Sequence, residues 1–184
     1  MLAGAAGVSA GWPRGTLDWQ PDRAWLEPWR WFTAAWVHLD REHLLANLAG
    51  ACVVAAFGHA AGCGRRDALA WALAWPLTHG ALLLVPAVQH AAGASGVLHA
   101  GVAVAAGTLL GGHGRRRTIG VLVLLGLLVK VLAEQPWVAP LRATAGWDFP
   151  VAVAVHASGV AAGLVAAAVA WATSRRRAAA TIRD

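Results

Sequence analysis

Long uncharged runs constrain this chain more than any other feature of its sequence. A helix needs about 20 apolar residues to cross the hydrocarbon core of a bilayer. Five runs approach that length, at about 43–64, 68–89, 91–114, 118–133 and 149–173. Only the run at 118–133 is interrupted by a charge, Lys130, and over all 184 residues 58% are hydrophobic and 13% charged. Because so few charges cannot coat a soluble surface of this size, the sequence predicts a single all-α polytopic membrane domain, 1–184, with five transmembrane helices.

Charged residues assign the ends of these helices to opposite sides of the membrane. Arginine clusters follow the first, third and fifth runs, at 65–66, 115–117 and 175–177. Because cytoplasmic loops retain Lys and Arg, we expect these loops and the basic tail 174–184 to be cytoplasmic, and the opposite helix ends to face the external side. The formal charge of +6 is then a signal of topology, and we expect the lipid bilayer as a partner and no nucleic acid.

Tryptophans are concentrated ahead of the first run. Residues 12–42 hold six of the 11 tryptophans, starting at Trp12 and separated by three prolines. An indole is favoured at the headgroup level, where its apolar ring and its polar N–H are both satisfied. We therefore expect an external interfacial loop of short helices broken at the prolines.

Four polar groups are expected at one depth within the external half of the bundle. Ser95 follows shortly after the external end of the third run, and His156 lies seven residues beyond Phe149, about 10 Å inward at 1.5 Å per residue. His43 and Asn47 are four residues apart at the external end of the first run, so they share a helix face. Polar groups are costly in a bilayer, which makes a shared functional cavity the favoured interpretation.

These residue types are the parts of a nucleophilic hydrolase. A serine hydroxyl attacks an amide carbonyl when a base takes its proton, and donors must stabilise the oxyanion that forms. His156 is the candidate base for Ser95, while His43, the Asn47 amide and the Ser95 N–H are candidate oxyanion donors. The carboxylate nearest to His156 in sequence is Asp148, which should lie closer to the interface, so a Ser-His dyad is expected rather than a triad.

Glycines on two runs would let the helices that carry Ser95 and His156 approach closely. They lie on the third and fifth runs at Gly93, Gly96, Gly101, Gly159 and Gly163.

Taken together, the motifs resemble those of rhomboid-family intramembrane serine proteases, over residues 27–170. The segments that carry the resemblance are Glu27–Thr33 with its Trp-Arg pair Trp29 and Arg30, His38, His43–Asn47, Gly93–His99 and His156–Gly163. The resemblance implies a rhomboid-like helical bundle with Ser95 as nucleophile, His156 as general base, and His43 and Asn47 at the oxyanion site. Rhomboids of this type generally have six helices, so the family's first helix is expected to be absent or truncated in this chain.

One branch of the family, the rhombosortases, is the more specific resemblance. His99 stands where many rhomboids have a tyrosine beside the catalytic histidine, and the stretch from Lys130 to Glu134 and Gln135 also favours this branch. For Lys130 and Glu134 the simplest expected role is mutual neutralisation within a helix. The branch implies substrates with a C-terminal sorting tail, made of a Gly-rich motif, a transmembrane helix and a basic end, cleaved near the outer face of a bacterial inner membrane.

Two other interpretations stay open. Eight histidines could ligate haem or a metal across helices, although no His-Glu-x-x-His motif is present and the two cysteines, Cys52 and Cys63, suit no zinc framework. A catalytically inactive rhomboid-like protein that binds helices without cutting them is the other. The serine hydrolase, which needs no cofactor and no metal, is the favoured prediction.

Overall fold

The computed structural model describes residues 14–181, with side chains for residues 15–174. Over this range the chain is helical, with two isolated β-bridges, Trp19–Ala91 and Arg142–Val151. The expectations for Met1–Trp12, for the arginine side chains at 175–177 and for the end of the basic tail lie outside the described residues.

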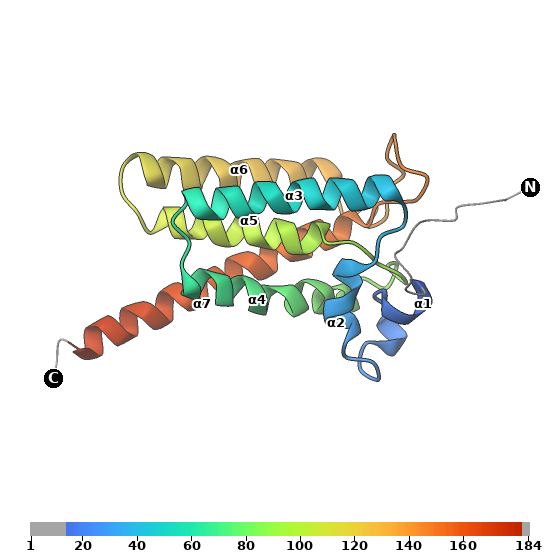
Figure 1. Cartoon of the computed structure of the whole chain (residues 1–184), viewed down its shortest axis with the longest axis horizontal. Helices are drawn as coiled ribbons and strands as arrows, with labels where there is room; N and C mark the ends of the chain where they lie inside the picture. The colour runs from blue at the N-terminus through green and yellow to red at the C-terminus, as the bar shows by residue number, and fades with distance from the viewer. Residues whose placement is uncertain (1–13, 182–184) are drawn as a thin grey trace, which may run out of the picture.

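The tryptophan-rich segment folds into short helical pieces, as its prolines predict. These are α1 (Arg14–Leu17), η1 (Pro21–Arg23), α2 (Arg30–Thr33) and η2 (Ala34–Trp36). Pro21 opens η1, where its fixed φ and missing N–H are tolerated. The pieces gather at one end of the bundle beside α4 (Figure 1).

Arg30 holds this segment together. Its guanidinium is fully buried and donates to the carbonyl oxygens of Asp18 and Gly15, at 2.7 and 2.9 Å, and to the carboxylates of Asp18 and Glu27. The two carboxylates neutralise the buried charge. The contacts of Arg30, the second residue of the Trp-Arg pair, therefore stabilise the fold of this segment.

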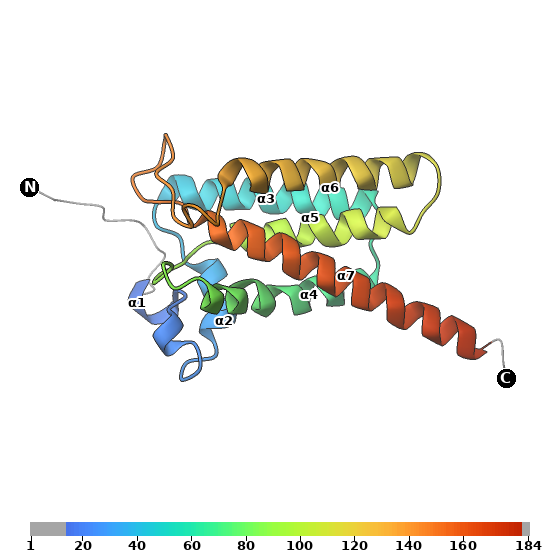
Figure 2. The same ribbon diagram turned by 180° about the vertical axis from the view of Figure 1, so that it is seen from behind.

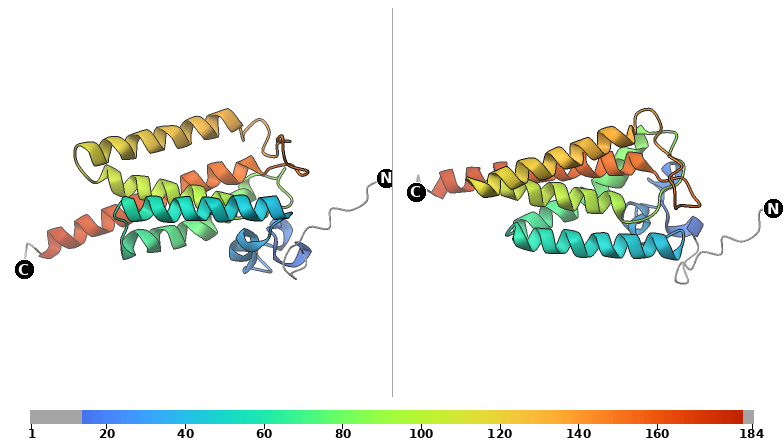
Figure 3. Two further views of the ribbon diagram at one scale, coloured as in Figure 1. Left: turned by 45° about the horizontal axis from the view of Figure 1, so that its top comes forward. Right: turned by 90° about the horizontal axis from the view of Figure 1, so that it is seen from above.

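Five long helices run alternately up and down the bundle. They are α3 (Arg41–Ala60), α4 (Arg65–Gly80), α5 (Ser95–Leu110), α6 (Arg115–Glu134) and α7 (Val153–Thr181), with η3 (Ala81–Leu84) continuing α4. The arginines at 65–66 and 115–117 are the first residues of α4 and α6. The loops that lead into these two helices, here called the arginine loops, lie at one end of the bundle, from which α7 projects (Figures 1 and 2). Helices α3 and α6 lie on two sides of α5 and pack mainly on it (Figure 3).

The helix bounds differ from the predicted runs by several residues at most ends, and the differences in the second, third and fourth runs are described here. The third run starts as a loop up to Ala94, because Gly93 has a φ of +101° and Ala91 pairs with Trp19. In the second run the helix leaves α geometry after Gly80. The fourth helix is longer than its run at both ends, since α6 begins at Arg115 and ends with Glu134.

Five transmembrane spans are not confirmed by length and composition. Within the described residues, Arg41–Ala60 and Val153–Ser174 are long and apolar enough to cross a membrane. The helices α4 and α5 have 16 residues each, and α6 carries arginines in its first turn and the Lys130–Glu134 pair in its last turns.

Backbone contact between α5 and α7 depends on glycine. A Cβ on Gly159 would overlap the carbonyl of Gly96, and one on Gly163 would lie 2.5 Å from the Ala100 oxygen. Because Gly159 and Gly163 have no side chain, the two helices can pack with their backbones in contact. Gly101 instead faces Val54 on α3 and so serves a different contact.

Candidate active site

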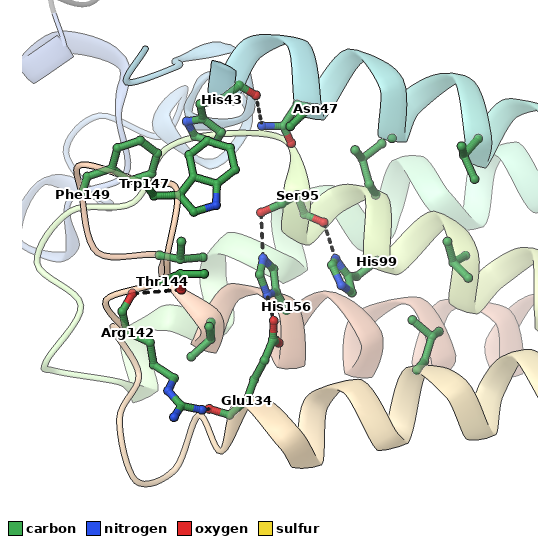
Figure 4. A pocket seen from close by; sticks show the side chains of 18 of the residues that line it. His43, Asn47, Ser95, His99, Glu134, Arg142, Thr144, Trp147, Phe149 and His156 are labelled. Carbon is green, nitrogen blue, oxygen red and sulfur yellow. Dashed lines mark hydrogen bonds and ion pairs between the residues drawn. The ribbon is translucent and has the colours of Figure 1, made fainter. Parts of the chain in front are cut away.

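A cavity of about 780 Å³ opens at the end of the bundle opposite the arginine loops. It lies between α3, α5, α6, α7 and the loop 142–151. Figure 4 shows the polar side chains that line it, which are His43, Asn47, Ser95, His99, Glu134, Arg142, Thr144 and His156. All four residues predicted to share a depth are among them.

Ser95 and His156 are in direct hydrogen-bond contact. The Ser95 Oγ lies 3.0 Å from His156 Nε2. Ser95 is the first residue of α5 and His156 the fourth of α7, so the glycine contact that joins these helices sets the distance between the two side chains. His156 is 6% exposed, so its imidazole is largely shielded from bulk water, while Ser95 is half-buried and lines the cavity.

The start of α5 at Ser95 was not predicted, and it has a chemical consequence. The N–H groups of a helix's first turn have no partner inside the helix, and the macrodipole makes that end positive. The Ser95 N–H is therefore at a position that favours a developing negative charge beside its own hydroxyl.

His43 and Asn47 form the facing wall on α3. Asn47 Nδ2 donates to the His43 carbonyl at 2.9 Å, which leaves its second hydrogen free. The Leu39 N–H lies 3.3 Å from His43 Nδ1 and donates to it, so a neutral His43 carries its proton on Nε2. That Nε2 lies against Gly93, where any Cβ would overlap it.

Aromatic rings from the neighbouring loops cover His43. Trp147 and Phe149 lie 5.7 and 5.2 Å from it between ring centroids, and His38 packs edge-on at 5.1 Å. Burial lowers the pKa of His38, against the opposing effect of its hydrogen bond to the Trp36 carbonyl. His38 is therefore neutral near pH 7 and adds no charge beside His43.

His99 stacks on His156. The ring centroids are 4.4 Å apart and the planes differ by 17°, while His99 Nδ1 donates to the Ser95 carbonyl at 2.6 Å. A haem held between two histidines needs its macrocycle between the rings, and this pair leaves no such space. Across the described part of the chain, no group of three or more His, Cys, Asp or Glu side chains is placed to hold a metal ion.

Glu134 is the site residue that sequence reasoning missed. Both of its carboxylate oxygens lie 3.0 Å from His156 Nδ1, so the expectation that no carboxylate would reach His156 is wrong. The expected pairing with Lys130 is present, at 2.5 Å. The i, i+4 spacing already places Glu134 with Lys130 on the fourth helix. What the sequence does not show is that this helix end lies beside His156.

Other predicted residues lie outside the cavity. Trp29 and Arg30 belong to the N-terminal segment and do not line the cavity. Two histidines without a predicted role have structural contacts. His79 bonds to the Trp31 carbonyl at 2.7 Å and His90 to the Asp18 carboxylate at 2.7 Å.

A comparison with known protein families shows to which family the chain belongs. A family model described as Rhomboid domain matches residues 26–176. This chain belongs to the rhomboid family. Rhomboids are serine intramembrane proteases that act on membrane proteins within the bilayer, so membership makes this an integral membrane protein and indicates a hydrolase. No curated protein and no solved structure gives a significant match to this rhomboid.

Proposed function

We propose that this rhomboid is an active intramembrane serine endopeptidase, with Ser95 as nucleophile and His156 as general base. The observation that carries the proposal is the 3.0 Å contact between Ser95 Oγ and His156 Nε2 inside a cavity of a rhomboid chain. A hydroxyl and an imidazole at this distance form the nucleophile–base pair that acyl transfer requires.

The chemistry follows from the groups around the pair. The Ser95 Oγ attacks the carbonyl carbon of a substrate peptide bond as its proton passes to His156 Nε2. The carbonyl electron pair moves to oxygen, where the Ser95 N–H, the His43 Nε2–H and the free Asn47 Nδ2 hydrogen are the donors. Collapse breaks the C–N bond, and His156 gives its proton to the leaving amine. Water then attacks the acyl carbon as His156 takes its proton. The bond between the acyl carbon and Ser95 Oγ breaks, His156 returns the proton to Oγ, and the acid product leaves.

The substrate we propose is a membrane-anchored protein with a C-terminal sorting tail, as the rhombosortase resemblance implies. A peptide bond locked in a helix cannot be presented in extended form to a nucleophile, so a Gly-rich motif at the cleavage site suits this mechanism. The remaining lining of the cavity is largely apolar, which suits a segment that arrives from the bilayer.

We propose the bacterial inner membrane as the location, with the cavity on the periplasmic side and the C-terminus in the cytoplasm. The arginine loops at 65–66 and 115–117 support this orientation, because they lie at the opposite end of the bundle from Ser95.

A reporter with such a tail, co-expressed with the full chain, tests the proposal. We expect Ser95→Ala and His156→Ala each to reduce tail removal to background, measured by the size of the reporter on a gel. Matched controls are Ser174→Ala and His113→Ala, which change the same residue types far from the cavity. Undiminished cleavage by either site variant would contradict the mechanism.

A further inference from the structure

We propose that Glu134 is a positioning residue that extends the Ser95–His156 pair to a Ser-His-Glu triad. The inference rests on the proposed function. It assigns to Glu134 a role beyond neutralising Lys130, namely holding the imidazole of His156 in the one tautomer that can accept the serine proton. The chain of contacts is Ser95 Oγ to His156 Nε2 at 3.0 Å, then His156 Nδ1 to both Glu134 oxygens at 3.0 Å (Figure 4).

The tautomer argument follows from what each group can donate. His156 accepts the Ser95 proton only if Nε2 is bare, which in a neutral imidazole requires the proton on Nδ1. The carboxylate of Glu134 is an acceptor, and it faces Nδ1 with both oxygens. It therefore favours the Nδ1–H form and stabilises the imidazolium produced in the first step.

The position of Lys130 makes the tautomer of His156 depend more strongly on Glu134. Its Nζ lies 3.3 Å from His156 Nδ1, and an ammonium can only donate. While Glu134 is present, Lys130 donates to that carboxylate at 2.5 Å, the shorter of its two contacts. Without the carboxylate, Lys130 would donate to Nδ1 and leave the proton on Nε2, facing Ser95, which is the unproductive form.

The backbone around Glu134 is fixed. Gln135 ends α6 in the left-handed region, with φ 48° and ψ 54°. Arg142 Nη1 donates to the carbonyl oxygens of Ala133 and Glu134 at 3.1 and 3.0 Å, closing the end of the helix. Because the backbone of Glu134 is fixed by these contacts, its carboxylate can orient the imidazole ring of His156.

Glu134→Gln in the full chain, purified in detergent, is the direct test. We expect kcat on the tailed substrate to fall at least tenfold with KM changed less than threefold, since the substitution alters proton transfer and not substrate binding. Asp22→Asn is the matched control, because it makes the same carboxylate-to-amide change at an exposed position far from the cavity. A fall in kcat of less than tenfold would overturn the triad.

A second measurement separates positioning from structural damage. The double variant Glu134→Gln/Lys130→Met removes the competing donor, so we expect its kcat to exceed that of Glu134→Gln severalfold. Nitrogen-15 NMR of the imidazole, assigned with a His156→Asn sample, should show the proton on Nδ1 in the wild type and on Nε2 in Glu134→Gln. Equal activity of the single and double variants, or an unchanged tautomer, would overturn the role given to Glu134.

The role of Glu134 can also be tested without a tailed substrate. Ser95-dependent labelling by a fluorophosphonate can replace substrate turnover as the readout, with the labelling rate expected to fall at least tenfold in Glu134→Gln. If Ser95→Ala leaves tail cleavage intact, the proposed function fails. If Ser95 is required but Glu134→Gln labels at the wild-type rate, only the triad fails.

Discussion

At the scale of single residues, Gly93 shapes the wall that faces Ser95. Its φ of +101° is strained for any residue with a side chain, and a Cβ would overlap His43 Nε2. Its N–H is bonded to the Ala34 carbonyl at 2.9 Å, so the loop cannot easily move away. The candidate oxyanion donor on His43 therefore depends on a residue that performs no chemistry itself.

We predict that Gly93→Ala displaces His43 and lowers kcat by about tenfold or more, the range expected when one oxyanion donor is lost. It should also cost more than about 1 kcal/mol of unfolding free energy. The control is Gly114→Ala, which has a positive φ of 54° but no atom within 4 Å of the added Cβ. Equal kcat for the two variants would show that His43 is not held by Gly93.

At the scale of helices, the contact of α5 with α7 is what brings Ser95 to His156. We predict that Gly159→Ala separates the two helices, because its Cβ would overlap the Gly96 carbonyl. The overpacking should cost about 1–3 kcal/mol or more and reduce fluorophosphonate labelling of Ser95. Gly126→Ala on α6 adds its Cβ to open space and should be neutral or stabilising by up to about 1 kcal/mol. Normal labelling of Gly159→Ala would refute this account.

The N-terminal helices depend on one buried cation. We predict that Arg30→Met destabilises the protein by about 3–5 kcal/mol, because it leaves the carboxylates of Asp18 and Glu27 without their buried partner. Arg23→Met breaks only an exposed pair with Glu27, at 3.4 Å, and should cost below about 1 kcal/mol. Equal unfolding free energies for the two variants, measured in detergent, would argue against the anchoring role of Arg30.

At the scale of the whole molecule, the cavity and the arginine loops lie at opposite ends of the bundle. We predict that a fluorescent protein fused after Asp184 is fluorescent in the cytoplasm, and that alkaline phosphatase inserted between Ala143 and Ala145 is active in the periplasm. This follows from retention of arginine-rich loops in the cytoplasm. Reversed activities would place the cavity on the other side and remove the periplasmic substrate class.

The sequence by itself determined the helical class, the positions of the main apolar runs and the choice of Ser95, His156, His43 and Asn47 as residues that share one cavity. This was possible because hydrophobic length, charge and helical spacing are local properties. It also determined the glycines that permit a close crossing, although not which partner each one faces.

Only the tertiary structure decided that Ser95 starts its helix and that Glu134 reaches His156. The first depends on the φ of Gly93 and on the pairing of Ala91 with Trp19, 72 positions away. The second joins α6 to α7 across 22 positions, and Glu134 would have lain in a loop had its helix ended one residue sooner. Contacts between distant segments depend on how helices pack and end, which no local pattern in the chain encodes.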